Sequence, residues 1–202
     1  MAERGRPRSF DRQQALAKAM EAFWTQGYEA TSIADLTAAM GIASPSLYAA
    51  FGSKEALFLE AVALYGATEG ELLWAPVANA PTARAAVEAW LLGTAKAFTR
   101  RGKPRGCLVT MATLDGDDCR ALQRKLGAMR AQSVDLLAEL FARGVTRGEI
   151  DDGVDLRAVA RYVVTVQQGM SIQARDGASR AELEQTARAA LAGWDALTRT
   201  AR

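Results

Sequence analysis

Residues 32–51 read SIADLTAAMGIASPSLYAAF, and this stretch decides the fold that we predict for the chain. Thr31 or Ser32 is a suitable N-cap for a short first helix, and Gly41 suits the tight turn that ends it. A second, shorter helix follows with Ser44 as its expected N-cap and a proline at its first position, where the missing N–H costs no hydrogen bond. Two short helices separated by a glycine turn predict a helix-turn-helix.

The flanking segments supply the helices on which this unit would rest. Upstream, Asp11 is a plausible N-cap and Gly27 a plausible end for a helix with one apolar stripe. Downstream, Lys54 opens a helix whose apolar residues extend to Tyr65. The apolar residues expected to join the first three helices are Leu16, Ala19, Met20, Phe23, Trp24, Ile33, Leu36, Met40, Leu47 and Phe51.

Residues 41–57, GIASPSLYAAFGSKEAL, resemble the signature of the TetR family of repressors. Upstream, Phe23, Gly27 and the residues as far as Ile33 match the same signature. The resemblance covers roughly residues 10–60 and is specific because five positions keep their spacing together. It implies an N-terminal DNA-binding domain followed by a helical domain whose sequence diverges within the family.

The resemblance also implies roles for individual residues. Thr31 and Ser32, at the start of the first short helix, would meet a phosphate through hydroxyls and free N–H groups. The first turn of the second helix would face the bases, whereas Tyr48 and Lys54 would hold phosphates and fix the register. The implied DNA contacts are Thr31, Ser32, Ser44, Pro45, Ser46, Tyr48 and Lys54.

Two features qualify how this chain would read DNA. Ala49 and Ala50 stand where larger side chains are common in the family, so base readout would rely on methyl contacts, DNA shape or an N-terminal arm. That arm contains Arg4, Arg6 and Arg8 and looks like the core of an AT-hook, whose arginines enter a narrow minor groove. A solubilising tail is the alternative, and residues 13–60 carry two lysines against five acids, so they form no basic patch.

The rest of the chain also has helical periodicity, and we predict an all-α fold in which a three-helix DNA-binding domain precedes a larger helical bundle. Proline and asparagine at 76–81 mark a loop, after which helices are expected over about 82–100, 107–114 and 119–146. Two further helices complete the chain. The predicted divisions are a basic arm at 1–9, the DNA-binding domain at 10–53, and an effector-binding and dimerisation domain at 54–202.

The C-terminal bundle is expected to bind an effector and to dimerise. Its apolar stripes contain few charges, so a small, largely apolar or aromatic ligand is the natural effector. The last two helices have wide apolar stripes, and two from each subunit would form a four-helix interface in a homodimer on double-stranded operator DNA. The residues expected to line the effector cavity are Trp90, Met111, Leu114, Phe141, Gln167 and Met170.

The composition argues against an enzyme and against a cofactor or metal. The chain has no histidine, which removes the usual catalytic triads and the commonest zinc ligand. The acids at 115, 117 and 118 lack calcium-loop spacing, so capping of the following helix explains them better than a metal site. Cys107 and Cys119 are either buried, inert thiols or a thiol-reactive sensor.

The sequence predicts a cytoplasmic protein, because it shows neither a signal peptide nor an apolar stretch long enough to span a membrane. The predicted function is that of a ligand-responsive repressor that binds a palindromic operator and is released by its effector. The alternative is an activator or architectural DNA-binding protein without a small-molecule effector, which a C-terminal domain without a pocket would favour. A helical enzyme is the weakest reading.

Overall fold

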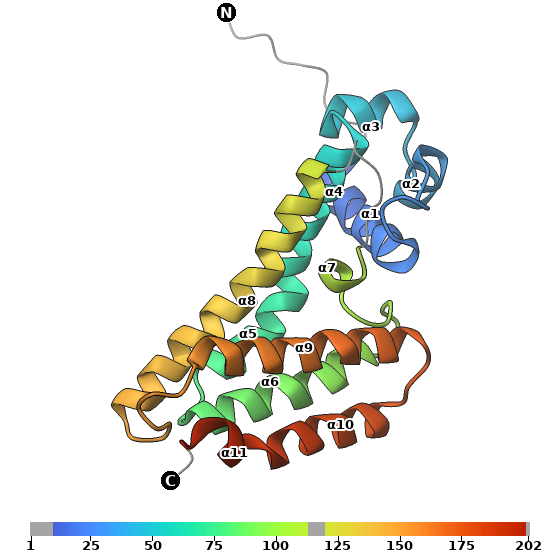
Figure 1. Ribbon diagram of the computed structural model, residues 1–202. Coiled ribbons are helices and arrows are strands. Elements are labelled where there is room, and N and C mark those ends of the chain that lie inside the picture. The colour runs from blue at the N-terminus through green and yellow to red at the C-terminus, as the bar shows by residue number, and fades with distance from the viewer. Residues whose placement is uncertain (1–9, 113–119, 201–202) are drawn as a thin grey trace, which may run out of the picture.

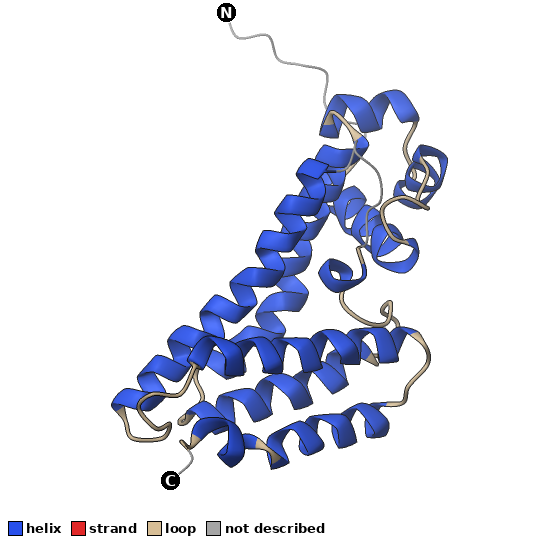
Figure 2. Ribbon diagram, in the orientation of Figure 1, coloured by secondary structure: helices blue, strands red, loops and turns tan. Residues whose placement is uncertain are grey.

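The computed structural model describes residues 10–112 and 120–200, and all of their regular structure is helical (Figures 1 and 2). A small group of helices forms one end of the molecule, and a larger helical body forms the other (Figure 1). The elements are α1 (Arg12–Gln26), α2 (Ile33–Met40), α3 (Ser44–Phe51), α4 (Lys54–Tyr65), the π-helical η1 (Gly66–Gly70), α5 (Glu71–Ala78), α6 (Ala83–Phe98), α7 (Leu108–Met111), α8 (Arg120–Thr146), α9 (Leu156–Arg175), α10 (Arg180–Ala192) and α11 (Trp194–Thr198).

Local signals set the ends of the first two helices as predicted. Asp11 caps α1 by accepting from two backbone N–H groups, and Gly27 follows its last turn with φ +86°. Ser32 caps α2, and Gly41 ends it in the left-handed conformation with φ +69°, which glycine adopts without steric cost. The predicted cap of α3 is wrong by one residue. Ala43 is the N-cap, and Ser44 is already the first helical residue, which puts the proline second.

Two buried clusters hold the molecule together. The N-terminal cluster packs α1–α4 around the fully buried rings of Phe23 and Phe58, which meet edge to face with centroids 5.0 Å apart. It also contains Leu108 of α7 and Leu122 of α8. The core around the helix-turn-helix therefore continues past residue 53 and includes side chains from the body.

The C-terminal cluster lies among α5, α6, α8, α9 and α10. In Figure 1, α8 runs from the N-terminal group down to the body, where it packs against α9 and α6, and α10 in turn packs against α6 and α9. Phe141 and Trp194 stack edge to face in this cluster, with ring centroids 5.6 Å apart. The short α11 that carries Trp194 is a separate element, where the sequence pattern predicted one continuous last helix.

The middle of the chain departs furthest from the sequence prediction. The helix that begins at Lys54 does not stop at Tyr65 but continues through η1 into α5, which contains Pro76 and ends at Ala78. The predicted loop is therefore shorter than expected, and Thr82 caps the next helix. Pro76 is the sixth of the eight residues of α5, so the hydrogen bond that its missing N–H removes lies close to the end of the helix.

Three side-chain contacts fasten α1 to the body. The indole Nε1 of Trp24 donates to the Gly106 carbonyl at 3.0 Å. The guanidinium of Arg175, at the end of α9, donates to the last carbonyls of α1 with both distances 2.8 Å. A cation there also suits the negative end of the helix dipole. Lys103 adds an ion pair with Glu21, with Nζ and Oε1 2.5 Å apart.

Candidate DNA-binding surface and ligand pocket

Helix α3 presents a surface of small side chains and one tyrosine. Leu47 and Phe51 are buried against the other helices, whereas Tyr48 is 48% exposed. Pro45 and Ala49 are exposed as well, and the two serines of the first turn are half-buried. The predicted base-facing residues therefore lie together on the accessible side of α3, next to the tyrosine expected to hold a phosphate.

Two phosphate contacts were predicted at the start of α2, and only one of the two residues is accessible. Ser32 is exposed and forms a capping box with Asp35, in which each side chain accepts from the other residue's backbone N–H. The Ser32 hydroxyl also donates to the Asp35 carboxylate at 2.6 Å, and these bonds hold the pKa of Asp35 below its usual value. Thr31 is fully buried and its hydroxyl donates to the Gly27 carbonyl at 2.5 Å. The expected hydroxyl contact of Thr31 with a phosphate is therefore wrong, because that hydroxyl anchors the turn before α2.

Lys54 lies at the start of α4 and is held in place by the turn after α1. Its ammonium is 4.5 Å from the centre of the Tyr28 ring, a cation–π distance, and it donates to the Glu29 carbonyl at 3.4 Å. These contacts fix the position of the positive charge while leaving the side chain partly exposed. A placed cation suits a phosphate contact, which positions a protein on DNA without reading sequence.

Arg12 is a structural residue that the sequence reading did not single out. Its guanidinium lies 4.3 Å from the centre of the Phe51 ring, donates to the Ala50 carbonyl at 3.2 Å, and pairs with Glu60 at 2.7 Å. The hydrogen bond with Glu60 raises the pKa of Arg12. One side chain of α1 thus braces the end of α3 and the middle of α4. The predicted minor-groove arginines Arg4, Arg6 and Arg8 lie outside the described residues.

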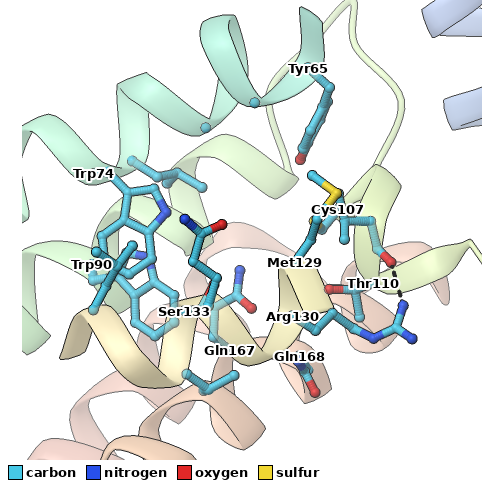
Figure 3. A pocket seen from close by; sticks show the side chains of 17 residues that line it. Tyr65, Trp74, Trp90, Cys107, Thr110, Met129, Arg130, Ser133, Gln167 and Gln168 are labelled. Atoms are coloured by element: carbon cyan, nitrogen blue, oxygen red, sulfur yellow. Dashed lines mark hydrogen bonds between the residues drawn. The ribbon is translucent and has the colours of Figure 1, made fainter. Parts of the chain in front are cut away.

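A cavity of about 260 Å³ lies in the body, between η1–α5 on one side and α8 and α9 on the other. Trp74 and Trp90 form one end, with their rings tilted by 35° and 5.1 Å apart (Figure 3). Cys107, Thr110 and Arg130 lie at the other end (Figure 3). Gln167 comes from α9 and lies between the two ends.

Only some of the residues predicted to line an effector cavity lie in this pocket. Trp90 and Gln167 line this pocket. Phe141 and Met170 do not, because they are buried in the C-terminal core with 0% and 1% exposure. Met111 lines a smaller cavity beside Phe23 and Trp24 instead. Leu114 lies outside the described residues, as does the second cysteine, Cys119.

Several lining residues were missed by the sequence reading. Tyr65 was expected only as a core residue, yet it also lines the pocket, where it lies beside Cys107 (Figure 3). Burial is the main cause that raises the pKa of Tyr65 well above its usual value. Arg130 lies on the pocket side of α8, and its guanidinium donates to the Val109 carbonyl at 3.0 Å. In the sequence, polar residues within 130–133 interrupt the apolar stripe of α8, and this interruption could have indicated the pocket.

Comparisons with known proteins agree with the helix-turn-helix geometry. Residues 15–61 match the family described as bacterial regulatory proteins, tetR family. The chain is 35% identical to the HTH-type transcriptional repressor ComR of Escherichia coli K12, over 97% of this chain and 94% of ComR. The chain belongs to the TetR family.

Other TetR-family relatives extend the similarity over nearly the whole chain. The HTH-type transcriptional repressor BdcR of Escherichia coli K12 is 32% identical over 94% of this chain and 90% of BdcR. A solved structure of a cysteine variant of the TetR family regulator CifR, complexed with 26-bp double-strand operator DNA, is 43% identical with a TM-score of 0.91. It covers 94% of this chain and all of that one. These relatives are transcriptional regulators, not enzymes.

The described residues contain neither a membrane-spanning helix nor a metal-binding cluster. Among them, no helix is long and apolar enough to cross a membrane. Within the same part of the chain, no group of three or more histidine, cysteine, aspartate or glutamate side chains is placed to hold a metal ion.

Proposed function

We propose that this TetR-family regulator is a homodimeric repressor that binds a palindromic operator and is released when a small, largely apolar effector binds its pocket. The observation that carries the DNA part is the exposed start of α3, with Tyr48 beside small side chains and Lys54 held nearby on Tyr28. The relative solved with operator DNA, CifR, supports the same docking mode because its fold matches along the whole chain. In that mode α3 enters the major groove and the start of α2 approaches the backbone.

Phosphate binding at α2 would rely on its backbone. The Ser32 hydroxyl is already engaged with Asp35, and Thr31 is buried. The free N–H groups of the first turn of α2 remain as donors, and the helix dipole favours an anion there. The serines of α3 and the tyrosine beside them would then meet the base edges and a second phosphate.

Dimerisation through α9 and α10, the last two long helices, is part of the proposal. Helix α9 exposes Tyr162 by 41% and Ile172 by 50%, two large side chains that a partner would bury. On α10, Glu184 pairs with two arginines of its own helix. The apolar part of the interface would therefore come from α9. A two-fold axis would place the two α3 helices about one helical turn of DNA apart, roughly 34–36 Å.

Helix α4 connects the two activities. Lys54 begins the helix at the DNA-binding surface, and Tyr65 ends it at the pocket. An effector that contacts the end of α4 would shift the helix and separate the two DNA-binding units. The pocket also argues against the alternative without an effector, which a solid body would have favoured.

The test is a gel-shift titration against the DNA upstream of the protein's own coding region, repeated over a salt series. We expect tight binding to a palindrome, and a loss of at least about tenfold for Tyr48→Ala or Lys54→Ala, since each removes a contact to charged phosphate. Lys96→Ala, at an exposed position of α6 in the body, is the matched control and should bind as the parent does. Binding without sequence preference at any moderate salt concentration would refute the repressor assignment.

A further inference from the structure

The charge of the pocket is unbalanced. Among the described residues that line it, Arg130 is the one that carries a charge at neutral pH, and none of them is a carboxylate. Within the described part of the chain, its guanidinium makes one hydrogen bond, to the Val109 carbonyl, and no ion pair. A guanidinium has five N–H donors, so four remain for other partners. Because the group is half-buried in a mostly apolar cavity, its attraction for an anion is screened less than on the open surface.

A second polar group in the pocket has no protein partner. Gln167 is only 7% exposed, lines the cavity, and its amide has no hydrogen bond with any described residue. Leaving a buried amide unpaired costs about 1–3 kcal/mol. The indole N–H of Trp90, at the other end, is a buried donor that likewise lacks a partner among the described residues. These groups indicate a ligand with polar atoms, not a hydrocarbon.

The remaining walls define the shape of the ligand. Trp74 and Trp90 provide flat surfaces at one end, against which an aromatic ring packs well in offset or tilted geometry. A cavity of about 260 Å³ lies just below the usual range for ligand sites, about 300–1,000 Å³, which excludes long lipids and large polycyclic molecules. The indoles and Arg130 lie at opposite ends of the pocket (Figure 3), so one small molecule that spans it would contact both.

We infer that the pocket binds a small aromatic carboxylate, with its ring against Trp74 and Trp90 and its carboxylate accepting hydrogen bonds from Arg130. Carboxylate is favoured over phosphate because one guanidinium carries a single positive charge, which balances a carboxylate, whereas a phosphate monoester carries about −1.5 to −2. The inference rests on the proposed function, since it names the class of effector for that same pocket. Cys107 lies beside the carboxylate end, so a thiol-reactive compound is the competing ligand class.

Three matched compounds test the class: cinnamate, which has ring and anion; cinnamyl alcohol, which has the ring alone; and hexanoate, which has the anion alone. Binding is measured by the shift in melting temperature and by quenching of tryptophan fluorescence, with benzoate and indole-3-acetate as further acids. We expect saturable binding of the aromatic acids and at least about tenfold weaker binding of the alcohol and of hexanoate, because each lacks one set of contacts.

Variants then locate the carboxylate. Arg130→Gln should weaken cinnamate binding by about 10- to 100-fold and leave cinnamyl alcohol unchanged, since only the acid uses the charged donor. Arg124→Gln, at an exposed position of the same helix, is the control and should bind cinnamate as the parent does. Gln167→Met, which keeps the volume and removes the amide, should weaken binding without lowering the melting temperature of the free protein. It serves as the second variant if Arg130→Gln is poorly folded.

Three results would overturn the inference. They are equal affinity for acid and alcohol, cinnamate binding that Arg130→Gln leaves unchanged, or no binding of any aromatic acid at millimolar concentration while alkylation of Cys107 by iodoacetamide releases DNA. The operator gel shift of the parent protein is run in parallel. Specific DNA binding together with any of these results rejects the ligand class alone, whereas absence of specific DNA binding rejects the proposed function.

Discussion

Gly106 lies at the joint between the DNA-binding end and the body, and its replacement by alanine is a quantitative test of that joint. The residue has φ +77°, a left-handed conformation in which an alanine costs about 1–2 kcal/mol. An added Cβ would also lie 2.8 Å from the carbonyl oxygen of Ser171 and 2.9 Å from its Oγ. Such overlap against a buried neighbour costs a further 1–3 kcal/mol or so.

The sum predicts that Gly106→Ala loses about 2–5 kcal/mol of unfolding free energy. For a chain of this size, each kcal/mol corresponds to roughly 2–4 °C in melting temperature, so a decrease of roughly 4–20 °C is expected. Gly102→Ala is the matched control, because Gly102 has φ +75° but no heavy atom within 4 Å of an added Cβ. Gly102→Ala should therefore lose only the free energy of placing an alanine in the left-handed conformation.

The assay is thermal unfolding followed by circular dichroism, for the parent and both variants at one protein concentration. The difference between the two variants isolates the contact with Ser171, since the gain from a stiffer unfolded chain is common to both. If Gly106→Ala melts at the same temperature as Gly102→Ala, the close approach of residues 106 and 171 does not exist in solution. The reasoning about a tight joint would then be refuted.

Three further predictions concern the DNA-binding end. Lys54→Gln should reduce the slope of log affinity for the operator against log salt by about 0.9 per subunit, because one phosphate contact is lost, while Lys96→Gln leaves it unchanged in the same titration. Arg175→Gln should lower the unfolding free energy by about 1–2 kcal/mol in urea titrations, since the carbonyls that end α1 lose their charged donor, and Arg188→Gln should not. Because the folded-state pKa of Asp35 is depressed, its contribution to stability is present above about pH 4 and is lost as pH falls further. Between about pH 5 and pH 3, the unfolding free energy of the parent should therefore decrease more than that of Asp35→Asn. Equal decreases would contradict the capping box.

Much of the DNA-binding end was predictable because its signals are local. Asp11, Gly27 and Gly41 act within a single turn of chain, through a cap or a positive φ, and the structure has each as predicted. The errors occurred where local chemistry allows two solutions. Both Ala43 and Ser44 precede a helical proline, and Thr31 carries a hydroxyl that serves a loop carbonyl as well as it would serve a phosphate.

The pocket was predictable only in part, because it depends on which helix faces which. Trp90 and Gln167 were identified as polar or aromatic members of apolar stripes, and they line the cavity. Phe141 has the same sequence character but faces Trp194, a partner about fifty residues away that periodicity cannot assign. Arg130 was overlooked for the opposite reason, since a charged residue on a long helix is usually solvated.

Two of the connections between the pocket and the DNA-binding end begin at neighbouring residues of the cavity wall. One is α4, whose last residue Tyr65 lines the pocket beside Cys107. The other is the loop before α7. There the Gly106 carbonyl accepts a hydrogen bond from Trp24 of α1, and the next residue is Cys107. A ligand that enters between these walls must contact both connections at once. On the proposed function, its binding energy therefore acts on α1 and α4 together, the two helices that support α2 and α3, and the helix-turn-helix would move as a unit without unfolding.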